Sequence, residues 1–453
     1  MEKKENKMGE RPVFSLLISM SLPMMLSMLV QALYNIVDSM YVSRLGTQAL
    51  TAVSLAYPLQ NIVVAVSVGI GVGISSALSI SLGEKNQEKA NETATMGMAL
   101  TLIHCILFVV FGLLATRPFL KLFTDSSEIL EDACDYTYIV LCVSFGSLLQ
   151  IALEKIYQGI GAMKTTMVLL ATGCIINIIL DPILIFGLFG VPAMGVKGAA
   201  IATVTGQIGA FLLYIAVYLR KNPGVTIHPR YLKKDWKLIK RIYSVGIPSS
   251  LMLMMPSLLV GALNGILAAF SEVYVAVLGV YFKLQTFIYM PANGMIQGMR
   301  PIIGYNYGAG QDERVRKTIW YCLLGTAGIM FFGTLLSLGI PDQIFRLFQA
   351  DETLLNAGAT ALRIISLGFL VSSVGTVFSG VFEALGRGGE SLAISLLRQL
   401  IITVPLGFVL SRMLGAEGIW IAFPVSELVA SAAALVLLRR YQNGRFFPLQ
   451  RKK

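Results

Sequence analysis

Charge is scarce in this chain of 453 residues, in which only 13% of the residues are charged and 55% are hydrophobic. A soluble globular chain carries about 25% charged residues, so this composition and the mean hydropathy of +0.73 exclude a soluble fold. Histidine and cysteine are also few, at two and five residues. The cysteines are odd in number and form no Cys-x-x-Cys pair, so we predict neither a disulfide framework nor a metal site.

The motifs of common catalytic and nucleotide-binding sites are absent as well. The chain has no Walker A sequence, no His-Glu-x-x-His and no Gly-x-Ser-x-Gly, so we predict neither an enzyme nor a bound cofactor. Gly69-x-Gly71-x-Gly73 is like a dinucleotide fingerprint, but it lies inside an apolar segment with no preceding strand. Close helix packing through Gly-x-x-x-Gly is therefore the preferred interpretation.

Long apolar runs fill the sequence instead. A helix of about 20 apolar residues crosses the hydrocarbon core of a bilayer, and runs of this kind recur along the whole chain. They lie at roughly 14–42, 50–82, 93–116, 134–159, 166–188, 197–219, 243–270, 274–304, 317–340, 358–384, 391–412 and 416–438. The sequence therefore predicts an all-α integral membrane protein of about twelve transmembrane helices in the lipid bilayer, with both termini on one side.

The basic residues indicate which side that is. Lys and Arg gather in alternate loops and at both ends of the chain, and such short basic segments stay in the cytoplasm. The termini are therefore predicted to be cytoplasmic, and the net charge of +11 reflects this topology and the anionic inner leaflet. Nucleic acid is not needed to explain it. The first apolar run is too long for a signal-peptide core, so we expect it to be retained as a helix.

The chain is a duplicated unit. At a constant separation of 225 residues, Pro23 matches Pro248, Gly69 matches Gly294, Gly73 matches Gly298 and Gly161 matches Gly386. Six spans per half give both copies the same orientation, which means parallel repeats. We predict a cytoplasmic tail (1–13), an N-lobe (14–219), a basic cytoplasmic linker (220–241), a C-lobe (242–438) and a second basic tail (439–453). Two such lobes suit alternating access.

A set of polar residues inside the spans is specific to the first half. Gln31, Tyr34, Asp38, Asn177, Asp181 and Thr203 align with Pro256, Leu259, Leu263, Ile402, Leu406 and Phe423 in the second half. A carboxylate at membrane depth costs about 2.5–3.5 kcal/mol even on lenient scales. Residues that the fold alone required would be expected in both copies, so we favour a functional site over a structural polar network.

The spacings of these residues favour one oxygen-rich site. Gln31, Tyr34 and Asp38 share one helical face, and Asn177 and Asp181 are one turn apart. Pro182 leaves the preceding turn with a free carbonyl and a predicted kink. Oxygen ligands suit Na⁺, while carboxylates brought close together share protons. We therefore predict an ion-coupling site for Na⁺, H⁺ or both, formed by Asp38, Asn177, Asp181 and Thr203, with Gln31 and Tyr34 as a supporting network.

A hinge and a substrate cavity are further expectations. Pro23 lies in the same helix as Asp38, so loading the site would change the bend at Pro23, although Pro248 repeats this proline where no acid follows and a static kink is an equal alternative. In the second half Lys283, Arg300 and Arg398 lie within spans, and Glu383 and Glu427 are candidate partners. Tyr34, Met255, Lys283 and Met290 are candidate cavity residues, since flexible methionines suit varied substrates.

Four stretches in order resemble the multidrug and toxic compound extrusion (MATE) family. They are Val37-Asp38-Ser-Met-Tyr-Val-Ser-Arg-Leu-Gly46, Asn177-x-x-x-Asp181-Pro-x-Leu-Ile-Phe-Gly187, Gly195-Val-x-Gly-Ala-Ala-Ile-Ala202 and Pro301-Ile-Ile-Gly-Tyr-Asn-Tyr-Gly308-Ala. The resemblance implies twelve helices in a V-shaped pair of lobes. It favours the DinF-type branch over the NorM-type, because Pro256 stands where the NorM type has a glutamate in the seventh helix.

The resemblance also implies a function. A secondary antiporter would export amphipathic, mostly cationic drugs or metabolites against Na⁺ or H⁺ entry, as a monomer in the inner membrane of a bacterial cell. A lipid-linked oligosaccharide flippase of the same superfamily is the alternative, in which Lys283, Arg300 and Arg398 would meet phosphate. The acidic residues of the first lobe argue against that alternative. A sensor without transport is disfavoured by the duplicated halves.

Overall fold

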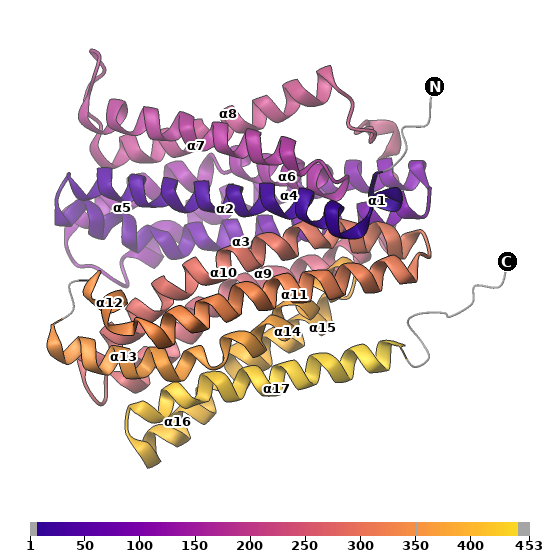
Figure 1. Ribbon diagram of the computed structural model, residues 1–453. Helices are drawn as coiled ribbons and strands as arrows, with labels where there is room; N and C mark the ends of the chain where they lie inside the picture. Colours follow the sequence, from indigo (N-terminus) through magenta and orange to yellow (C-terminus); the bar gives the residue numbers. More distant parts are fainter. Residues whose placement is uncertain (1–6, 349–350, 443–453) are drawn as a thin grey trace. The chain divides into compact units, whose positions relative to one another are not determined.

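The computed structural model describes residues 7–348 and 351–442, and every regular element within those ranges is a helix. The first half contains α1 (Lys7–Glu10), α2 (Val13–Ser43), α3 (Thr47–Gly83), α4 (Gln87–Leu120), α5 (Ser127–Cys142), α6 (Phe145–Gly159), α7 (Met163–Phe186), α8 (Gly195–Arg220) and η1 (Pro229–Tyr231). The second half contains α9 (Trp236–Leu267), α10 (Glu272–Gly308), α11 (Asp312–Gly339), α12 (Pro341–Arg346), α13 (Glu352–Ser366), α14 (Phe369–Ala384), α15 (Gly388–Leu396), η2 (Leu397–Ile401), α16 (Thr403–Leu414) and α17 (Glu417–Gln442). Figure 1 shows this order along the chain.

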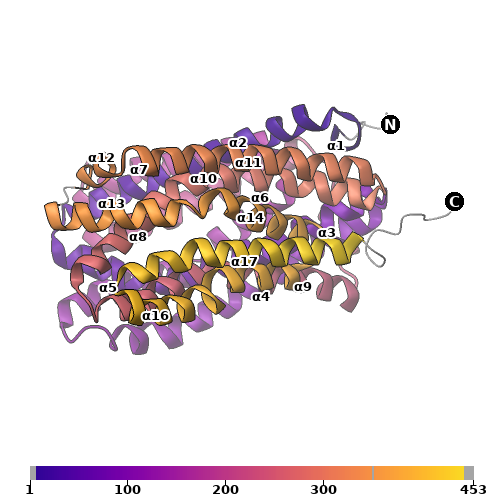
Figure 2. The same ribbon diagram turned by 60° about the horizontal axis from the view of Figure 1, so that its bottom comes forward.

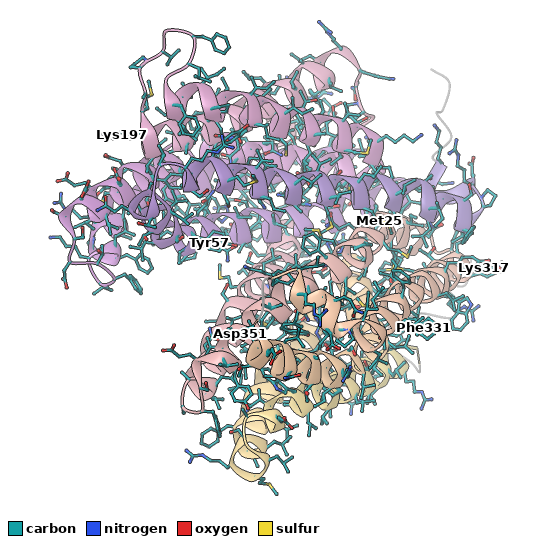
Figure 3. The ribbon with its side chains drawn as sticks, turned by 60° about the vertical axis from the view of Figure 1, so that its left-hand side comes forward. Met25, Tyr57, Lys197, Lys317, Phe331 and Asp351 are labelled. Carbon is teal, nitrogen blue, oxygen red and sulfur yellow. The ribbon has the colours of Figure 1, made fainter. Side chains whose placement is uncertain are left out.

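Ten described helical segments are long and apolar enough to cross a membrane, when α15, η2 and α16 are taken together as one segment (Gly388–Leu414). Two bent helix pairs raise the number of candidate spans to twelve. Their outer faces remain apolar. Leu114 is 71% exposed and Phe331 is 52% exposed, and Figure 3 shows the side chains that cover the helices. Large apolar side chains on the outside of a long helix are suited to contact with lipid. The predicted class, an all-α membrane protein, is confirmed.

Two predicted spans are broken. The run at 134–159 forms α5 and α6, which meet at an angle of 45°, and the run at 358–384 forms α13 and α14, which meet at 53°. The breaks fall at Val143–Ser144 and Leu367–Gly368, which is within one residue of the 225-residue separation of the repeat. The hydropathy of each run is continuous across its break, so apolar length alone does not reveal the change of direction.

The described residues gather into two compact units, and their boundaries cut two helices. The N-unit is Leu26–Ser250, and the C-unit combines Met1–Met25 with Leu251–Lys453. The first boundary lies inside α2, two residues after Pro23, where the chain passes from the C-unit to the N-unit. The second lies inside α9, two residues after Pro248, where the chain returns to the C-unit. The continuous lobes expected from the repeat, with a linker at 220–241, stay a prediction.

Repeat-related glycines hold the start of each of these two helices. In the N-unit, a Cβ atom on Gly73 of α3 would lie 2.2 Å from the backbone oxygen of Ile242 in α9. In the C-unit, a Cβ atom on Gly298 of α10 would lie 2.7 Å from the backbone nitrogen of Ser21 in α2. Only glycine permits backbones to approach this closely. The predicted role of Gly69-x-Gly71-x-Gly73 in close helix packing is confirmed.

Chain segments that precede these helices are also anchored. In the N-unit, the linker crosses α4, where the Thr226 amide donates to Asn91 Oδ1 at 2.8 Å and Lys233 pairs with Glu92 at 2.6 Å. In the C-unit, Arg314 of α11 donates to the backbone oxygens of Met8 and Arg11 at 3.1 and 2.7 Å. Polar contacts therefore stabilise the start of the first helix of each half, in addition to its apolar packing.

Inside each unit the last two spans of the half pack together. In the N-unit α7 packs along α8, as Figure 1 shows, and α8 also contacts α5 and α6. In the C-unit α16 and the neighbouring η2 pack along α17, as Figure 2 shows, and α17 also contacts α13 and α14. These two helix pairs carry most of the polar residues described in the next subsection.

Candidate functional site

The pair α7 and α8 buries three of the predicted residues. Asn177 and Asp181 lie one turn apart on α7, Thr203 lies on α8, and these residues are 2%, 0% and 4% exposed. The Asn177 amide donates to Asp181 Oδ1 at 3.5 Å and to Thr203 Oγ1 at 3.4 Å. A Cβ atom on Gly206 of α8 would lie 3.0 Å from Asn177 Cβ, so the glycine lets the two helices close around the amide.

The helix α2 brings Asp38 and Tyr34 to the same place. The side chains of Asp38 and Asp181 lie close enough to interact electrostatically, and two like charges at this range favour a proton or a cation between them. Tyr34, one turn before Asp38, interacts with Thr203. Four predicted ion-site residues and Tyr34 are therefore brought together within the N-unit, where they form the Asp38 cluster.

Oxygen atoms in this cluster lack partners. One carboxyl oxygen of Asp38, one of Asp181 and the amide oxygen of Asn177 are buried and accept no hydrogen bond from the described residues. A buried acceptor without a donor costs about 1–3 kcal/mol, and more when it is charged. Three such oxygens in one cluster favour a cation or a proton as the group that satisfies them.

Two further residues of the cluster were not predicted from the sequence. Tyr136 of α5 interacts with Thr203 and with Gln60 of α3, so α3 and α5 also reach the site. The repeat comparison contained a signal for Tyr136, because its counterpart in the second half is Ala361. It contained none for Gln60, whose counterpart Gln285 is also a glutamine.

The other predicted residues lie outside this cluster. Gln31 is exposed and has no hydrogen-bond partner among the described residues, so the structure does not connect it to Asp38. Pro182 follows Asp181 inside α7, which continues to Phe186, and its missing N–H leaves the carbonyl of Ile178 without a helical donor. Pro23 lies in α2 within the C-unit.

The charged residues of the second half mostly pair with one another. Arg300 forms an ion pair with Glu383, and Arg398 forms one with Glu427 at 3.2 Å. Lys283 is exposed and forms no ion pair among the described residues. Met255 is buried and Met290 is half-buried, and both belong to the C-unit with Lys283. Their part in a substrate cavity with Tyr34 stays a prediction.

The donor set of the Asp38 cluster limits the cation that it suits. Nowhere among the described residues do three or more His, Cys, Asp or Glu side chains gather as a metal site would require. The cluster offers two carboxyls, an amide oxygen and hydroxyls, which are ligands for a hard monovalent cation or for a proton. These residues fit Na⁺ and H⁺ equally.

Comparison with known proteins confirms the duplication and identifies the family. The MatE family profile matches the chain twice, over residues 23–183 and 248–409. The chain belongs to the MATE family. It is therefore a multi-pass membrane transporter rather than an enzyme, and the two matches begin at Pro23 and Pro248, as the repeat requires.

Relatives of this MATE protein cover nearly its whole length. It is 26% identical over 435 residues to the multidrug export protein MepA of Staphylococcus haemolyticus, covering 96% of this chain and 95% of MepA. It is 27% identical to a MATE protein solved in a straight and in a bent conformation, with TM-scores of 0.89 and 0.90 over 97% of this chain and 98% of the other. These matches leave the DinF-type assignment a prediction.

Replacement of Tyr136 tests whether this unpredicted residue supports the site. We expect Tyr136→Phe to lower export by about threefold to tenfold, because a hydroxyl–hydroxyl hydrogen bond contributes about 0.5–1.5 kcal/mol. Initial export rates in vesicles would measure the change. Tyr138→Phe, on the same helix, is the matched control and should export normally. Equal losses in both variants would contradict a specific role for Tyr136.

Proposed function

We propose that this MATE transporter exports amphipathic, mostly cationic drugs or metabolites, with Na⁺ or H⁺ entry through the Asp38 cluster as the driving force. The observation that carries the proposal is the pair of carboxyl groups, Asp181 buried and Asp38 half-buried, each with one buried oxygen that has no partner among the described residues. The name of the relative MepA, multidrug export protein, supports the substrate class. Both termini would lie in the cytoplasm of a bacterial cell, and the monomer would be the working unit.

The negative charge of the Asp38 cluster explains how Na⁺ or H⁺ would be exchanged for a cationic substrate. Two carboxylates held against each other in a low-dielectric surrounding repel, so the site is stable only with a proton or a cation between them. Entry of Na⁺ or H⁺ would supply that charge and satisfy the free oxygens. A cationic substrate would compete for the same negative charge, so the loaded and substrate-bound states would exclude each other. This competition is the basis of antiport by alternating access.

The helix α2 is the element that would transmit the loading of the site. It carries both Pro23 and Asp38, and it passes from the C-unit to the N-unit between them. A proline within a helix removes one backbone hydrogen bond and favours a bend at that point. Related MATE structures are named for a straight and a bent conformation, which supports a cycle between two conformations. Pro248 in α9 leaves a static kink as the alternative.

Flippase activity is the less favoured function. A cavity that binds lipid phosphate needs several unneutralised basic groups. Of the three candidates, Arg300 and Arg398 each pair with a glutamate, and Lys283 alone forms no ion pair among the described residues. The Asp38 cluster adds negative charge in the other unit. Competition by lipid-linked oligosaccharides in a transport assay would reveal flippase activity if it exists.

The coupling ion can be determined in proteoliposomes. We expect an inward gradient of Na⁺, of H⁺ or of either ion to drive export of a fluorescent organic cation, because the donor set suits both ions. If both gradients drive export, the two ions should compete for the Asp38 cluster. Each gradient would be imposed separately, with the other ion equal on both sides. Liposomes without protein are the control. Export that is independent of both gradients would contradict the proposal.

A further inference from the structure

The linker between the two halves, residues 220–241, carries a large excess of positive charge. Its single acidic residue is Asp235, whose carboxylate accepts a hydrogen bond from the Lys237 amide at 2.9 Å at the start of α9. Its eight basic residues are Arg220, Lys221, Arg230, Lys233, Lys234, Lys237, Lys240 and Arg241. The linker lies wholly within the N-unit, where it connects α8 to α9. None of these residues belongs to the Asp38 cluster, so their charge has another role.

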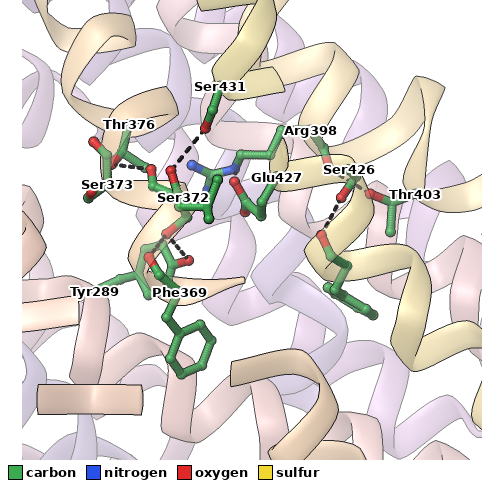
Figure 4. A network of polar contacts seen from close by, with 12 residues as sticks. Tyr289, Phe369, Ser372, Ser373, Thr376, Arg398, Thr403, Ser426, Glu427 and Ser431 are labelled. Atoms are coloured by element: carbon green, nitrogen blue, oxygen red, sulfur yellow. Dashed lines mark hydrogen bonds and ion pairs between the residues drawn. The ribbon is translucent and has the colours of Figure 1, made fainter. Parts of the chain in front are cut away.

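Most of this positive charge lacks an acidic partner. Lys233 is neutralised by Glu88 and Glu92 of α4, at 2.7 and 2.6 Å. The other seven basic residues of the linker form no ion pair with any residue that the structure describes. Arg398 in the C-unit is different, because it lies beside Glu427, as Figure 4 shows. The linker therefore presents positive charge that a partner from outside the chain can neutralise.

Polar contacts with α4 hold the backbone of the linker in place. Gln87 Nε2 donates to the Gly224 oxygen at 2.7 Å, and the His228 amide donates to Thr95 Oγ1 at 3.3 Å. These contacts add to the pairing of Lys233 with the same helix. A segment whose backbone is already ordered loses less conformational freedom when it binds a partner. The exposed basic side chains are therefore presented from a fixed backbone.

The outer face of α9 changes from basic to apolar within two turns. Ile242 faces the core of the N-unit and is fully buried, whereas Lys237 and Lys240 are exposed. Ile247, seven residues after Lys240 and on the same face, is 52% exposed. With a rise of 1.5 Å per residue, the change takes about 10 Å. Trp236, at the first position of α9, is 67% exposed. This order of side chains is typical of a helix that enters a bilayer from its surface.

Aromatic rings lie beside two of the linker's cations. The Arg230 guanidinium carbon lies 4.6 Å from the centroid of the Tyr231 ring, and Lys234 Nζ lies 5.6 Å from the centroid of the Trp236 ring. Tyrosine and tryptophan prefer the headgroup level of a bilayer, because their rings are apolar and carry one polar group. A cation that lies beside such a ring is therefore at the depth of the lipid phosphates.

We propose that the linker and the first turns of α9 form a binding surface for the headgroups of anionic phospholipids. The lipid phosphate meets Lys234, Lys237 and Lys240, the Trp236 ring lies among the headgroups, and the acyl chains follow α9 past Ile247. A zwitterionic headgroup carries a cation that these lysines repel, so the surface selects lipids with net negative charge. This surface does not depend on the proposed export function or on the side of the membrane that the linker faces.

Tryptophan fluorescence would report which lipids lie beside this surface. Of the three tryptophans in the chain, Trp420 is fully buried, whereas Trp236 and Trp320 are exposed. In full-length protein with Trp320→Phe, lipid can therefore quench Trp236 selectively. Nanodiscs would contain phosphatidylcholine with a minor fraction of phosphatidylglycerol, and quenching brominated chains would be placed on equal amounts of one lipid or the other. We expect an about threefold enrichment of phosphatidylglycerol beside Trp236, because each basic residue at the surface attracts anionic lipid.

Two matched double variants separate a local effect from an effect of net charge. Lys237→Gln with Lys240→Gln should bring the enrichment beside Trp236 close to one. Arg117→Gln with Lys121→Gln removes the same charge from the other end of α4 and should leave the enrichment unchanged. All four side chains are exposed, so the substitutions should not prevent folding. Raising the salt concentration should lower the enrichment in the unaltered linker, because salt screens exposed charges.

Three outcomes would overturn the lipid surface. The first is equal quenching of Trp236 by the two brominated lipids when the linker is unaltered. The second is an equal loss of enrichment in both double variants, which would indicate a response to net charge alone. The third is displacement of phosphatidylglycerol by inorganic phosphate at matched ionic strength, which would assign the surface to free phosphate. Loss of enrichment in the Lys237 and Lys240 variant alone would support the proposal, and no transport is needed to observe it.

Discussion

Asp38→Asn is expected to reduce ion-driven export to the background rate of empty liposomes. The substitution keeps the size of the side chain but removes the negative charge that faces Asp181. A hydrogen bond or ion contact to a charged group contributes about 1.5–3 kcal/mol, which corresponds to an about tenfold to hundredfold lower ion affinity. Without its ion the site has no driving force to exchange for substrate.

The measurement is export of a fluorescent cation under separate Na⁺ and H⁺ gradients. Asp181→Asn should have a similar effect, since a single carboxyl group cannot hold the proton or cation that the two groups share. Asp135→Asn is the matched control in the same unit, because Asp135 pairs with Lys197 at the surface at 2.9 Å and both side chains are more than one-third exposed. Normal export by Asp38→Asn under both gradients would refute the assigned ion site.

Gly73→Leu is expected to prevent stable folding of the N-unit. Even the first carbon of a side chain at this position would lie 2.2 Å from the Ile242 oxygen and 3.1 Å from the Gly246 nitrogen. These are backbone atoms, so α3 and the start of α9 would have to separate. Overpacking in a core costs about 1–3 kcal/mol and sometimes more, and a displaced backbone places this change at the upper end.

Thermal unfolding of the purified protein in detergent would measure the effect, with Gly73→Ala as a milder version. Gly298→Ala, at the repeat-related position, should lower the unfolding temperature comparably because it meets the backbone of Ser21. Gly328→Ala on α11 is the control, since no atom lies within 4 Å of its Cβ position and alanine favours a helix over glycine. An unchanged unfolding temperature for Gly73→Leu would contradict the close packing.

Much of the Asp38 cluster could be predicted because membrane burial makes each polar residue informative. An acid such as Asp38 is costly inside a bilayer, and the internal repeat supplied a comparison for it in Leu263. That comparison selected Asn177, Asp181 and Thr203, which the structure brings together. It gave no signal for Gln60, because a glutamine stands at this position in both halves. It also selected Gln31, which is exposed and has no hydrogen-bond partner among the described residues, so its part in the network stays a prediction.

The sequence by itself determined the class of the protein, its duplication, its spans and the residues that set the first half apart, because hydropathy and repeat identity are properties of residues taken in order. Only the tertiary structure decided which side chains meet. Backbone direction decides where two spans break, at Val143–Ser144 and Leu367–Gly368. Contacts between helices distant in sequence decide that α2 and α9 each belong to both units and that Arg398 pairs with Glu427. Such contacts arise from close packing, which no periodicity along a single helix records.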